Sequence, residues 1–264
     1  MTDPATYGPW AVIAGGSEGV GAEFARQLAA DGLNLVLVAR KSGPLEQTAQ
    51  TVRALGVEVR TVAADLTDPS AIAAIATATE DLEVGLLIYN AGANSYGRAF
   101  TDGELDGFRG VIDLNLTAML ALTHHYARPM RERGRGGILL VGSLAGYVGT
   151  STEGVYGGVK AFSRIFAEGL WAELREHGVH VLELVLGVTR TPAMERAGLN
   201  FDVPGMHVSE PADVAREGLA ALPHGPVHVV SGNEGLVAMR STEDRARLVA
   251  GTEKVLRMLV PRQS

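Results

Sequence analysis

The chain of 264 residues contains no cysteine. This absence excludes disulfide bonds, thiolate metal sites, iron–sulfur clusters and cysteine nucleophiles. Positive charge is also scarce, because 23 lysines and arginines stand against 30 aspartates and glutamates, and the formal net charge is −7. Such an acidic chain argues against a surface for nucleic acid or another polyanion, although it leaves room for a small local basic site.

Long apolar runs are missing as well. No run reaches the roughly 20 residues that a membrane-spanning helix needs, and the first seven residues lack the basic and apolar regions of a signal peptide. The 33 glycines follow no three-residue period, which excludes a collagen-like chain. With 46% hydrophobic residues the chain can bury a full core. We expect a soluble, cytoplasmic protein with one domain over residues 1–264.

Short apolar runs alternate with longer helical patterns. The candidate strands are Trp10–Ala14, Asn34–Ala39, Val57–Ala63, Leu86–Asn90, Gly137–Ser143, Val179–Leu186 and Val227–Val230. The helical patterns lie near residues 19–32, 43–55, 69–80, 103–134, 153–177, 210–222 and 241–259. Most of the strands are apolar throughout, which is typical of parallel strands covered by helices on both faces. The alternation predicts a Rossmann-type α/β fold, with a doubly wound, mainly parallel sheet of seven strands.

Residues 187–209 break this alternation, because prolines and glycines interrupt any regular pattern there. An irregular segment after the sixth strand is a candidate lid or substrate loop. Its apolar residues suit a pocket wall or simple packing of the lid; they are Met194, Leu199, Phe201 and Met206. The last helical pattern has an apolar face that predicts packing on the body or on a partner subunit; its residues are Leu248, Val249, Val255, Leu256 and Leu259.

The first strand leads into a glycine-rich turn. Gly15, Gly19 and Gly21 allow a tight turn and a close approach of the backbone to a ligand. The N-terminus of the following helix offers free N–H groups to a pyrophosphate. The placement between a strand and a helix favours a dinucleotide site over a turn without a ligand. The candidate binding residues of this turn are Gly15, Ser17, Glu18, Gly19 and Val20.

The end of the second strand bears on the choice between NADP and NAD. An NAD site usually has an acidic residue roughly 20 residues after the glycines, whereas this chain has Arg40 and Lys41 there. The planar guanidinium of Arg40 suits a 2′-phosphate, and Lys41 could support it. NADP(H) is therefore favoured. NAD(H) stays open, because Arg40 could be a solvated residue at a strand end and Glu18 would oppose a phosphate nearby.

A candidate catalytic group follows the fifth strand. Ser143 lies at the carboxyl end of that strand, where open α/β sheets bind ligands, and its hydroxyl could hydrogen-bond a substrate oxygen. Tyr156 and Lys160 are four residues apart, so they share one face of the next helix. A free phenol has a pKa of about 10, and a neighbouring ammonium that stabilises the phenolate lowers that value. Taken alone, the Tyr-x-x-x-Lys spacing is equally compatible with coincidence.

These motifs, in this order, resemble the short-chain dehydrogenase/reductase family over nearly the whole chain. Ala14 to Gly21 is similar to the family's Thr-Gly-x-x-x-Gly-x-Gly turn, and Ser143 precedes Tyr156 by the family's interval of 13 residues. The resemblance implies that Asp65 holds the adenine amino group. It implies the following cofactor-binding residues beyond the glycine turn and Arg40: Asp65, Leu66, Asn90, Ala91, Gly92, Tyr156, Lys160, Gly187, Val188, Thr189 and Thr191.

The resemblance also implies catalytic roles. Tyr156 is expected to exchange a proton with the substrate oxygen, and Ser143 to position that oxygen. Lys160 is expected to bind the nicotinamide ribose and to depress the pKa of Tyr156. Asn115 is expected to kink its helix and to order a water that links Lys160 to solvent. The segment 187–191 would cradle the nicotinamide amide.

Four residues depart from the family pattern: Ala14 replaces Thr, Tyr89 replaces the first Asn of Asn-Asn-Ala-Gly, Leu186 replaces Pro, and Gly158 occupies a position within Tyr-x-x-x-Lys that is often Ser. The first two changes remove hydrogen bonds between neighbouring segments, so the rigidity of these segments cannot be assumed. Leu186 leaves the nicotinamide loop less constrained in φ. No departure removes a proton donor or acceptor, and we expect catalysis to survive.

The sequence thus predicts an NAD(P)-dependent dehydrogenase/reductase that interconverts an alcohol and a ketone or aldehyde on a fairly apolar substrate. The alternatives are a non-catalytic NADP-sensing protein, a subunit that needs a partner, and an epimerase or dehydratase of the same fold. The histidines show no ligand spacing and no metal is expected; His124 and His125 should face solvent or a subunit contact. By family analogy, the helices at 103–134 and 153–177 predict a homodimer or homotetramer.

Overall fold

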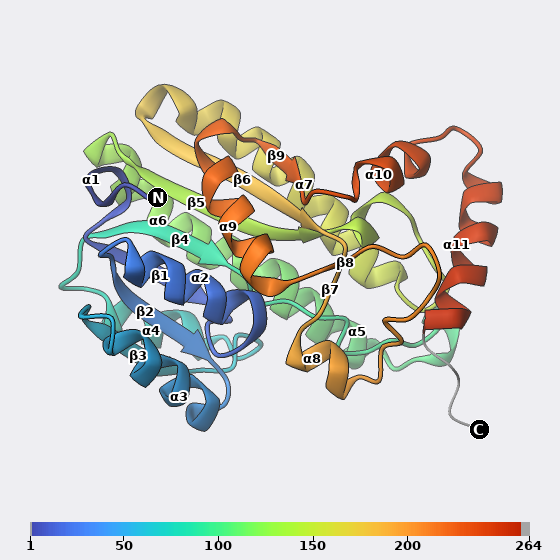
Figure 1. Cartoon of the computed structure of the whole chain (residues 1–264), viewed down its shortest axis with the longest axis horizontal. Helices are drawn as coiled ribbons and strands as arrows, with labels where there is room; N and C mark the ends of the chain where they lie inside the picture. Colours follow the sequence, from blue (N-terminus) through green and yellow to red (C-terminus); the bar gives the residue numbers. More distant parts are fainter. Residues whose placement is uncertain (1, 260–264) are drawn as a thin grey trace.

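A computed structural model of the chain describes residues 2–259, without the side chains of residues 253 and 256–259. Its centre is a seven-stranded sheet in the order β3–β2–β1–β4–β5–β6–β9, and all neighbouring strands are parallel (Figure 1). The strands are β1 (Trp10–Ala14), β2 (Asn34–Ala39), β3 (Val59–Ala63), β4 (Val84–Tyr89), β5 (Gly136–Ser143), β6 (Val179–Leu186) and β9 (Val227–Val229). The predicted Rossmann-type α/β fold is confirmed.

Helices cover both faces of the sheet, because the strands are apolar on both sides. One face packs against α2 (Gly19–Ala30), α3 (Ser42–Arg53) and α9 (Pro211–Ala221). The other face packs against α4 (Ser70–Ala78), α6 (Ala118–Arg133) and α7 (Gly154–Leu174). Each strand therefore supplies alternate residues to two separate cores, which explains the continuous apolar runs in the sequence.

The strand order reverses at β1, whose neighbours are β2 on one side and β4 on the other. The chain reaches β3 at one edge of the sheet and then returns to the middle to form β4. In open parallel sheets, ligands bind at the carboxyl ends of the strands beside such a reversal. The glycine turn after β1 and the segment after β4 flank this point, and Ser143 at the end of β5 follows on the same edge.

The helical pattern at 103–134 is not one regular helix. It consists of a 3₁₀ turn (Phe100–Asp102), α5 (Leu105–Ile112), a π-helical turn (Asp113–Thr117) and α6. A π turn adds a residue to one turn of a helix and occurs frequently at functional sites. The helical pattern is therefore interrupted, and the interruption contains Asn115, the residue that the family resemblance expects to kink its helix.

Several short elements were not predicted. They are α1 (Pro4–Tyr7), β7 (Val188–Thr189), α8 (Pro192–Arg196), β8 (Val208–Ser209) and α10 (Glu234–Arg240). The strands β7 and β8 form a separate two-stranded sheet, so the segment 187–209 is more regular than its sequence indicates.

The last helical pattern corresponds to α11 (Arg245–Leu259). In α11 Leu248 is buried and Val255 is exposed, whereas the side chains of Leu256 and Leu259 lie outside the described residues. Among the described helices, none is long and apolar enough to cross a bilayer.

Candidate active site

The glycine-rich turn has the backbone that a close phosphate contact requires. Gly15 and Gly19 have φ angles of +83° and +55°, a region that favours glycine. A Cβ atom on Gly21 would lie 1.9 Å from the carbonyl oxygen of Gly15, so no larger residue fits there. The side chain of Asn90 donates a hydrogen bond to the same oxygen at 2.9 Å. The segment after β4 thus holds the turn in place.

Glu18 stands at the N-cap of α2 but does not cap the helix. Its carboxylate instead accepts hydrogen bonds from the guanidinium of Arg196 in α8, at 2.9 and 2.5 Å. The N–H groups of the first turn of α2 are therefore left without a side-chain cap, as a phosphate-binding helix N-terminus requires. The ion pair also compensates the negative charge of Glu18, which was the sequence feature that opposed a nearby phosphate.

Arg40 follows β2 with an exposed side chain, and its guanidinium lies 4.0 Å from the carboxylate of Asp65. One oxygen of Asp65 accepts hydrogen bonds from the N–H and the hydroxyl of Thr67, at 3.0 and 2.8 Å. These hydrogen bonds, helped by the charge of Arg40, hold the pKa of Asp65 below its ordinary value. The ionic contact between Arg40 and Asp65 is long, so the guanidinium keeps its donors available to an anion. The neighbouring Leu66 is buried in the core.

Ser143, Tyr156 and Lys160 come together at the carboxyl end of β5. Ser143 ends the strand and its hydroxyl oxygen accepts a hydrogen bond from the N–H of Ala145 at 3.1 Å. The ammonium nitrogen of Lys160 lies 5.7 Å from the centre of the Tyr156 ring. Lys160 is buried and donates a hydrogen bond to the carbonyl oxygen of Val141 at 2.9 Å.

Burial has the largest effect on the pKa of Tyr156. Burial raises the pKa of Tyr156 to about 12, although the Ser143 hydroxyl acts in the opposite direction. Burial also lowers the pKa of Lys160 to about 8. In the protein alone, burial therefore outweighs any lowering of the Tyr156 pKa by Lys160. Desolvation of the phenolate outweighs an ammonium that lies over 5 Å from the ring centre and is bonded to a carbonyl.

Asn115 is 2% exposed and lies in the π turn. Its side-chain nitrogen donates hydrogen bonds to the carbonyl oxygens of Val111 at 2.9 Å and Ala93 at 3.0 Å. The bond to Val111, four residues earlier, competes with the hydrogen bonds of the helix and accounts for the distortion. The Oδ1 atom of Asn115 is buried without a hydrogen-bond partner among the described residues. It lies beside Gly92, as does the ammonium of Lys160.

Tyr89 replaces the lost Asn interaction with a different one. Its hydroxyl donates a 2.5 Å hydrogen bond to the carbonyl oxygen of Leu114, in the π turn. This bond fastens the end of β4 to the turn that carries Asn115. The rigidity that the sequence left open is therefore supplied by Tyr89 itself, which sequence reasoning did not identify as a connecting residue.

The segment 187–191 runs alongside the glycine turn. A Cβ atom on Gly187 would lie 2.1 Å from the side-chain oxygen of Asn233, so this glycine permits a close contact. The hydroxyl of Thr189 donates to the carbonyl oxygen of Gly187 at 3.3 Å. Thr191 caps the N-terminus of α8 and lies next to Gly19, 3.1 Å from where a Cβ would stand. The structure therefore places the segment after β6 against the glycine turn.

Two arginines attach the C-terminal helices to the active-site region. Arg240 of α10 donates a hydrogen bond to the carbonyl oxygen of Leu144 at 2.6 Å, and Arg245 of α11 donates to that of Tyr147 at 2.8 Å. Both carbonyls lie in the 3₁₀ turn directly after Ser143. Sequence reasoning missed these contacts and the one made by Arg196, because nearly 100 residues or more separate the partners.

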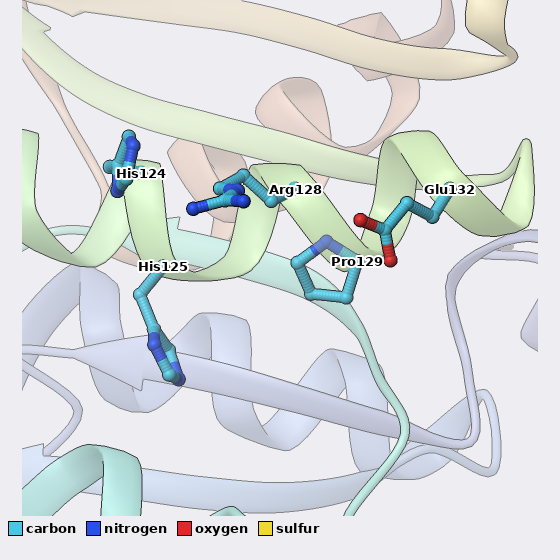
Figure 2. Close-up of a pocket in the computed structure, with 5 residues that line it drawn as sticks. All are labelled: His124, His125, Arg128, Pro129 and Glu132. Atoms are coloured by element: carbon cyan, nitrogen blue, oxygen red, sulfur yellow. The ribbon is translucent and has the colours of Figure 1, made fainter.

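A hollow of about 370 Å³ lies along the exposed side of α6 (Figure 2). It is lined by His124, His125, Arg128, Pro129 and Glu132. Burial, with a smaller effect of His124, lowers the pKa of His125. Nowhere in the described part of the chain do three or more histidine or acidic side chains form a group that could hold a metal ion.

Comparison with known proteins settles the family. The family model for short chain dehydrogenase matches residues 9–200. The chain belongs to the short-chain dehydrogenase/reductase family. It is therefore an oxidoreductase, as its named relatives are.

A 7beta-hydroxysteroid dehydrogenase of Collinsella aerofaciens is 35% identical over 189 residues, which cover 71% of this chain and 72% of the relative. A solved structure from work on 7beta-hydroxysteroid dehydrogenase stereoselectivity has a TM-score of 0.87 at 28% identity, covering 96% of this chain and 100% of that one. A short-chain dehydrogenase of Sphingobium yanoikuyae in complex with NADPH has a TM-score of 0.78 at 30% identity, with coverage of 97% and 98%.

Proposed function

We propose that this short-chain dehydrogenase/reductase uses NADP(H) to interconvert an alcohol and a ketone or aldehyde on a fairly apolar substrate. The observation that carries the proposal is the convergence of Ser143, Tyr156 and Lys160 at the end of β5, with Asn115 beside Lys160. This edge of the sheet also carries the glycine turn, so a proton donor and a dinucleotide site lie together.

A bound nicotinamide cofactor supplies the hydride in this class of reaction. Tyr156 donates its phenolic proton to the substrate oxygen during reduction, and it accepts that proton during oxidation. Ser143 hydrogen-bonds the same oxygen as negative charge develops on it. Because burial raises the pKa of Tyr156 to about 12, the phenol carries its proton at neutral pH and can serve as the acid in reduction. Lys160 stabilises the phenolate that remains.

The residues present fit the cofactor. The uncapped start of α2 and the glycine turn would hold the pyrophosphate. Arg40 would contact a 2′-phosphate, and the ion pair of Glu18 with Arg196 removes the charge that would oppose it. A similar protein has been solved with NADPH, which supports the same choice. NAD(H) is the alternative cofactor.

A fairly apolar substrate is supported by two observations. The segment 187–209 adjoins the glycine turn through Thr191 and carries the exposed apolar side chain of Met194. A relative with 35% identity is named for its action on a hydroxysteroid. We therefore place a steroid-like ketone or alcohol first among the substrates to be tested.

A homodimer or homotetramer is part of the same proposal. On α7, which family analogy assigns to a subunit contact, Phe162 and Ile165 are 41% and 57% exposed. Exposed apolar residues that cluster on one helix face suit burial against another subunit. The cytoplasmic location stays a prediction of the sequence.

Parallel titrations with NADPH and NADH test the cofactor assignment without a known substrate. Nicotinamide fluorescence is followed as the protein is added to each cofactor. We expect NADPH to bind at least about tenfold more tightly, because each charge-assisted hydrogen bond contributes roughly 1.5–3 kcal/mol. Equal or tighter NADH binding would contradict the NADP assignment, and failure of both to bind would contradict the proposed function.

A further inference from the structure

A carboxyl group that the proposed mechanism does not use lies in the interior near Lys160. Glu183 is on β6 and is only 1% exposed. Val179 and Val181, at alternate positions of the same strand, belong to the core beneath α6 and α7, so Glu183 points to that side of the sheet. Its Oε1 atom lies over Gly142 of β5, 2.5 Å from where a Cβ atom would stand. The strand next to β6 thus leaves space for this side chain.

The position is costly for a carboxyl group. The Oε2 atom of Glu183 is buried without a hydrogen-bond partner among the described residues. Burial raises the pKa of Glu183 to about 7, while Lys160 and, more weakly, the Ser163 hydroxyl and Arg164 favour the charged form. A buried carboxylate without a full set of partners destabilises a fold unless a nearby cation compensates it. An apolar residue would fill this space at a lower cost.

The charged and titratable groups around Glu183 single out one partner. They come from α7, which carries Lys160, Arg164 and Glu168, and from the 3₁₀ turn after β5, which carries Tyr147. Arg164 pairs with Glu168 at 3.3 Å and lies over the Tyr147 ring at 4.9 Å, while its Nε atom is buried without a hydrogen-bond partner among the described residues. The ammonium of Lys160 is buried and donates to a neutral backbone carbonyl. Of the two cations, Lys160 has the larger favourable interaction with the Glu183 carboxylate, so Lys160 is its main partner.

We propose that Glu183 is a positioning residue that keeps the ammonium of Lys160 protonated behind Tyr156. The inference rests on the proposed function. Burial lowers the pKa of Lys160 to about 8, and Glu183 is the group that acts against this decrease. When Tyr156 gives its proton to the substrate oxygen, the phenolate needs a neighbouring positive charge. A neutral lysine amine would not supply that charge, so the carboxylate extends the pH range over which Tyr156 acts.

The test is the pH dependence of kcat for carbonyl reduction in Glu183→Gln. The amide keeps the size of the side chain and removes its charge. We expect the alkaline limb of the profile to move about one pH unit toward lower pH. At a pH above the alkaline limbs of both proteins, kcat of the variant should then be about tenfold lower than that of the wild type. Glu173→Gln, which removes an exposed carboxylate from α7, is the matched control and should leave the limb in place.

Two further variants keep the test decisive. Glu183→Met is unbranched and leaves no buried polar group, so it replaces Glu183→Gln if the amide does not fold, and the same shift is expected. Glu183→Asp retains the charge and should keep the limb closer to the wild-type position than either uncharged variant does. An alkaline limb that stays in place in the uncharged variants, or that moves as far in Glu183→Asp, would overturn the proposal.

The failure of this inference is distinguishable from failure of the proposed function. An active Tyr156→Phe variant would remove the proton donor from the mechanism, whatever Glu183 does. An inactive Tyr156→Phe variant, together with unchanged pH profiles in the Glu183 variants, would leave the proposed function intact and assign Glu183 a structural role only.

Discussion

At the scale of single residues, the proposed preference for NADP(H) rests on Arg40. Its guanidinium is exposed and makes only a 4.0 Å ionic contact with Asp65, so its removal should leave the fold unchanged. We expect Arg40→Ala to weaken NADPH binding about ten- to hundredfold, as the loss of charge-assisted hydrogen bonds implies. NADH has no 2′-phosphate, and its affinity should change little. Nicotinamide fluorescence titrations of the variant with both cofactors measure the two effects.

Lys41→Ala is the matched control for this variant, because it removes an adjacent positive charge without the planar donor fork of arginine. A smaller loss of NADPH affinity is expected than in Arg40→Ala. Equal losses in the two variants would mean that the general positive charge of the strand end, and not Arg40, selects the cofactor.

Residue identities at the site were predictable where local spacing determines them. Tyr156 and Lys160 share a helix face because four residues separate them, and Ser143 reaches the site because it ends a buried strand. The partnership of Glu18 with Arg196 was not predictable, since no local pattern relates residues 178 positions apart. The raised pKa of Tyr156 also escaped prediction, because it follows from burial, which is a property of the folded chain.

At the scale of elements, length decided what the sequence could predict. The strands at the centre of the sheet are apolar runs of five to eight residues, and the helices that cover them have clear periodicity. β7 and β8 have two residues each and α8 has five, too few for a period to show. One local signal for α8 was present, since Thr191 precedes Pro192 in the arrangement of a helix cap followed by proline at the first position.

The π turn illustrates a second limit. The residue pattern alone gives residues 103–134 as one helical stretch, and only the family resemblance indicated a kink at Asn115. The distortion arises from the side-chain bonds of Asn115 to Val111 and Ala93, and the hydroxyl of Tyr89 fastens the turn to β4. The bond to Val111 is local, whereas the bonds that involve Ala93 and Tyr89 join the π turn to the end of β4 and the segment after it. Together these bonds fix Asn115 beside Lys160. Tertiary contacts of this kind override local propensity.

At the scale of the whole molecule, the predicted oligomer can be tested by a substitution on the exposed apolar face of α7. Phe162 stacks on Phe166 with ring centres 5.9 Å apart, and Ile165 is exposed on the same helix. We expect the wild-type protein to be a dimer or tetramer and Ile165→Glu to shift it toward monomers, because a carboxylate is costly to bury in a contact. Light scattering of the eluting protein, at matched concentrations, gives the mass.

Ala172→Glu, which places the same charge on an exposed position of α7 outside this cluster, should leave the assembly unchanged. A monomeric wild-type protein would contradict the assembly prediction. So would an Ile165→Glu variant with the wild-type mass.

The fold brings the glycine turn, the Ser143 end of β5 and the segment 187–209 to one edge of the sheet, because neighbouring strands are all parallel (Figure 1). The order of the strands depends on pairing between distant segments, and the alternation of elements together with the family resemblance was enough to predict its class. The central claim that follows is chemical: a phenol at this edge transfers the proton while hydride transfer occurs.

The most direct test of that claim compares wild-type protein with Tyr156→Phe in NADPH-dependent reduction of a panel of apolar ketones that includes a 7-ketosteroid. General acid catalysis of this kind contributes about 10²–10⁴-fold, so we expect kcat to fall by that factor while the dissociation constant for NADPH stays nearly unchanged. A Tyr156→Phe variant that keeps the wild-type kcat would contradict the account.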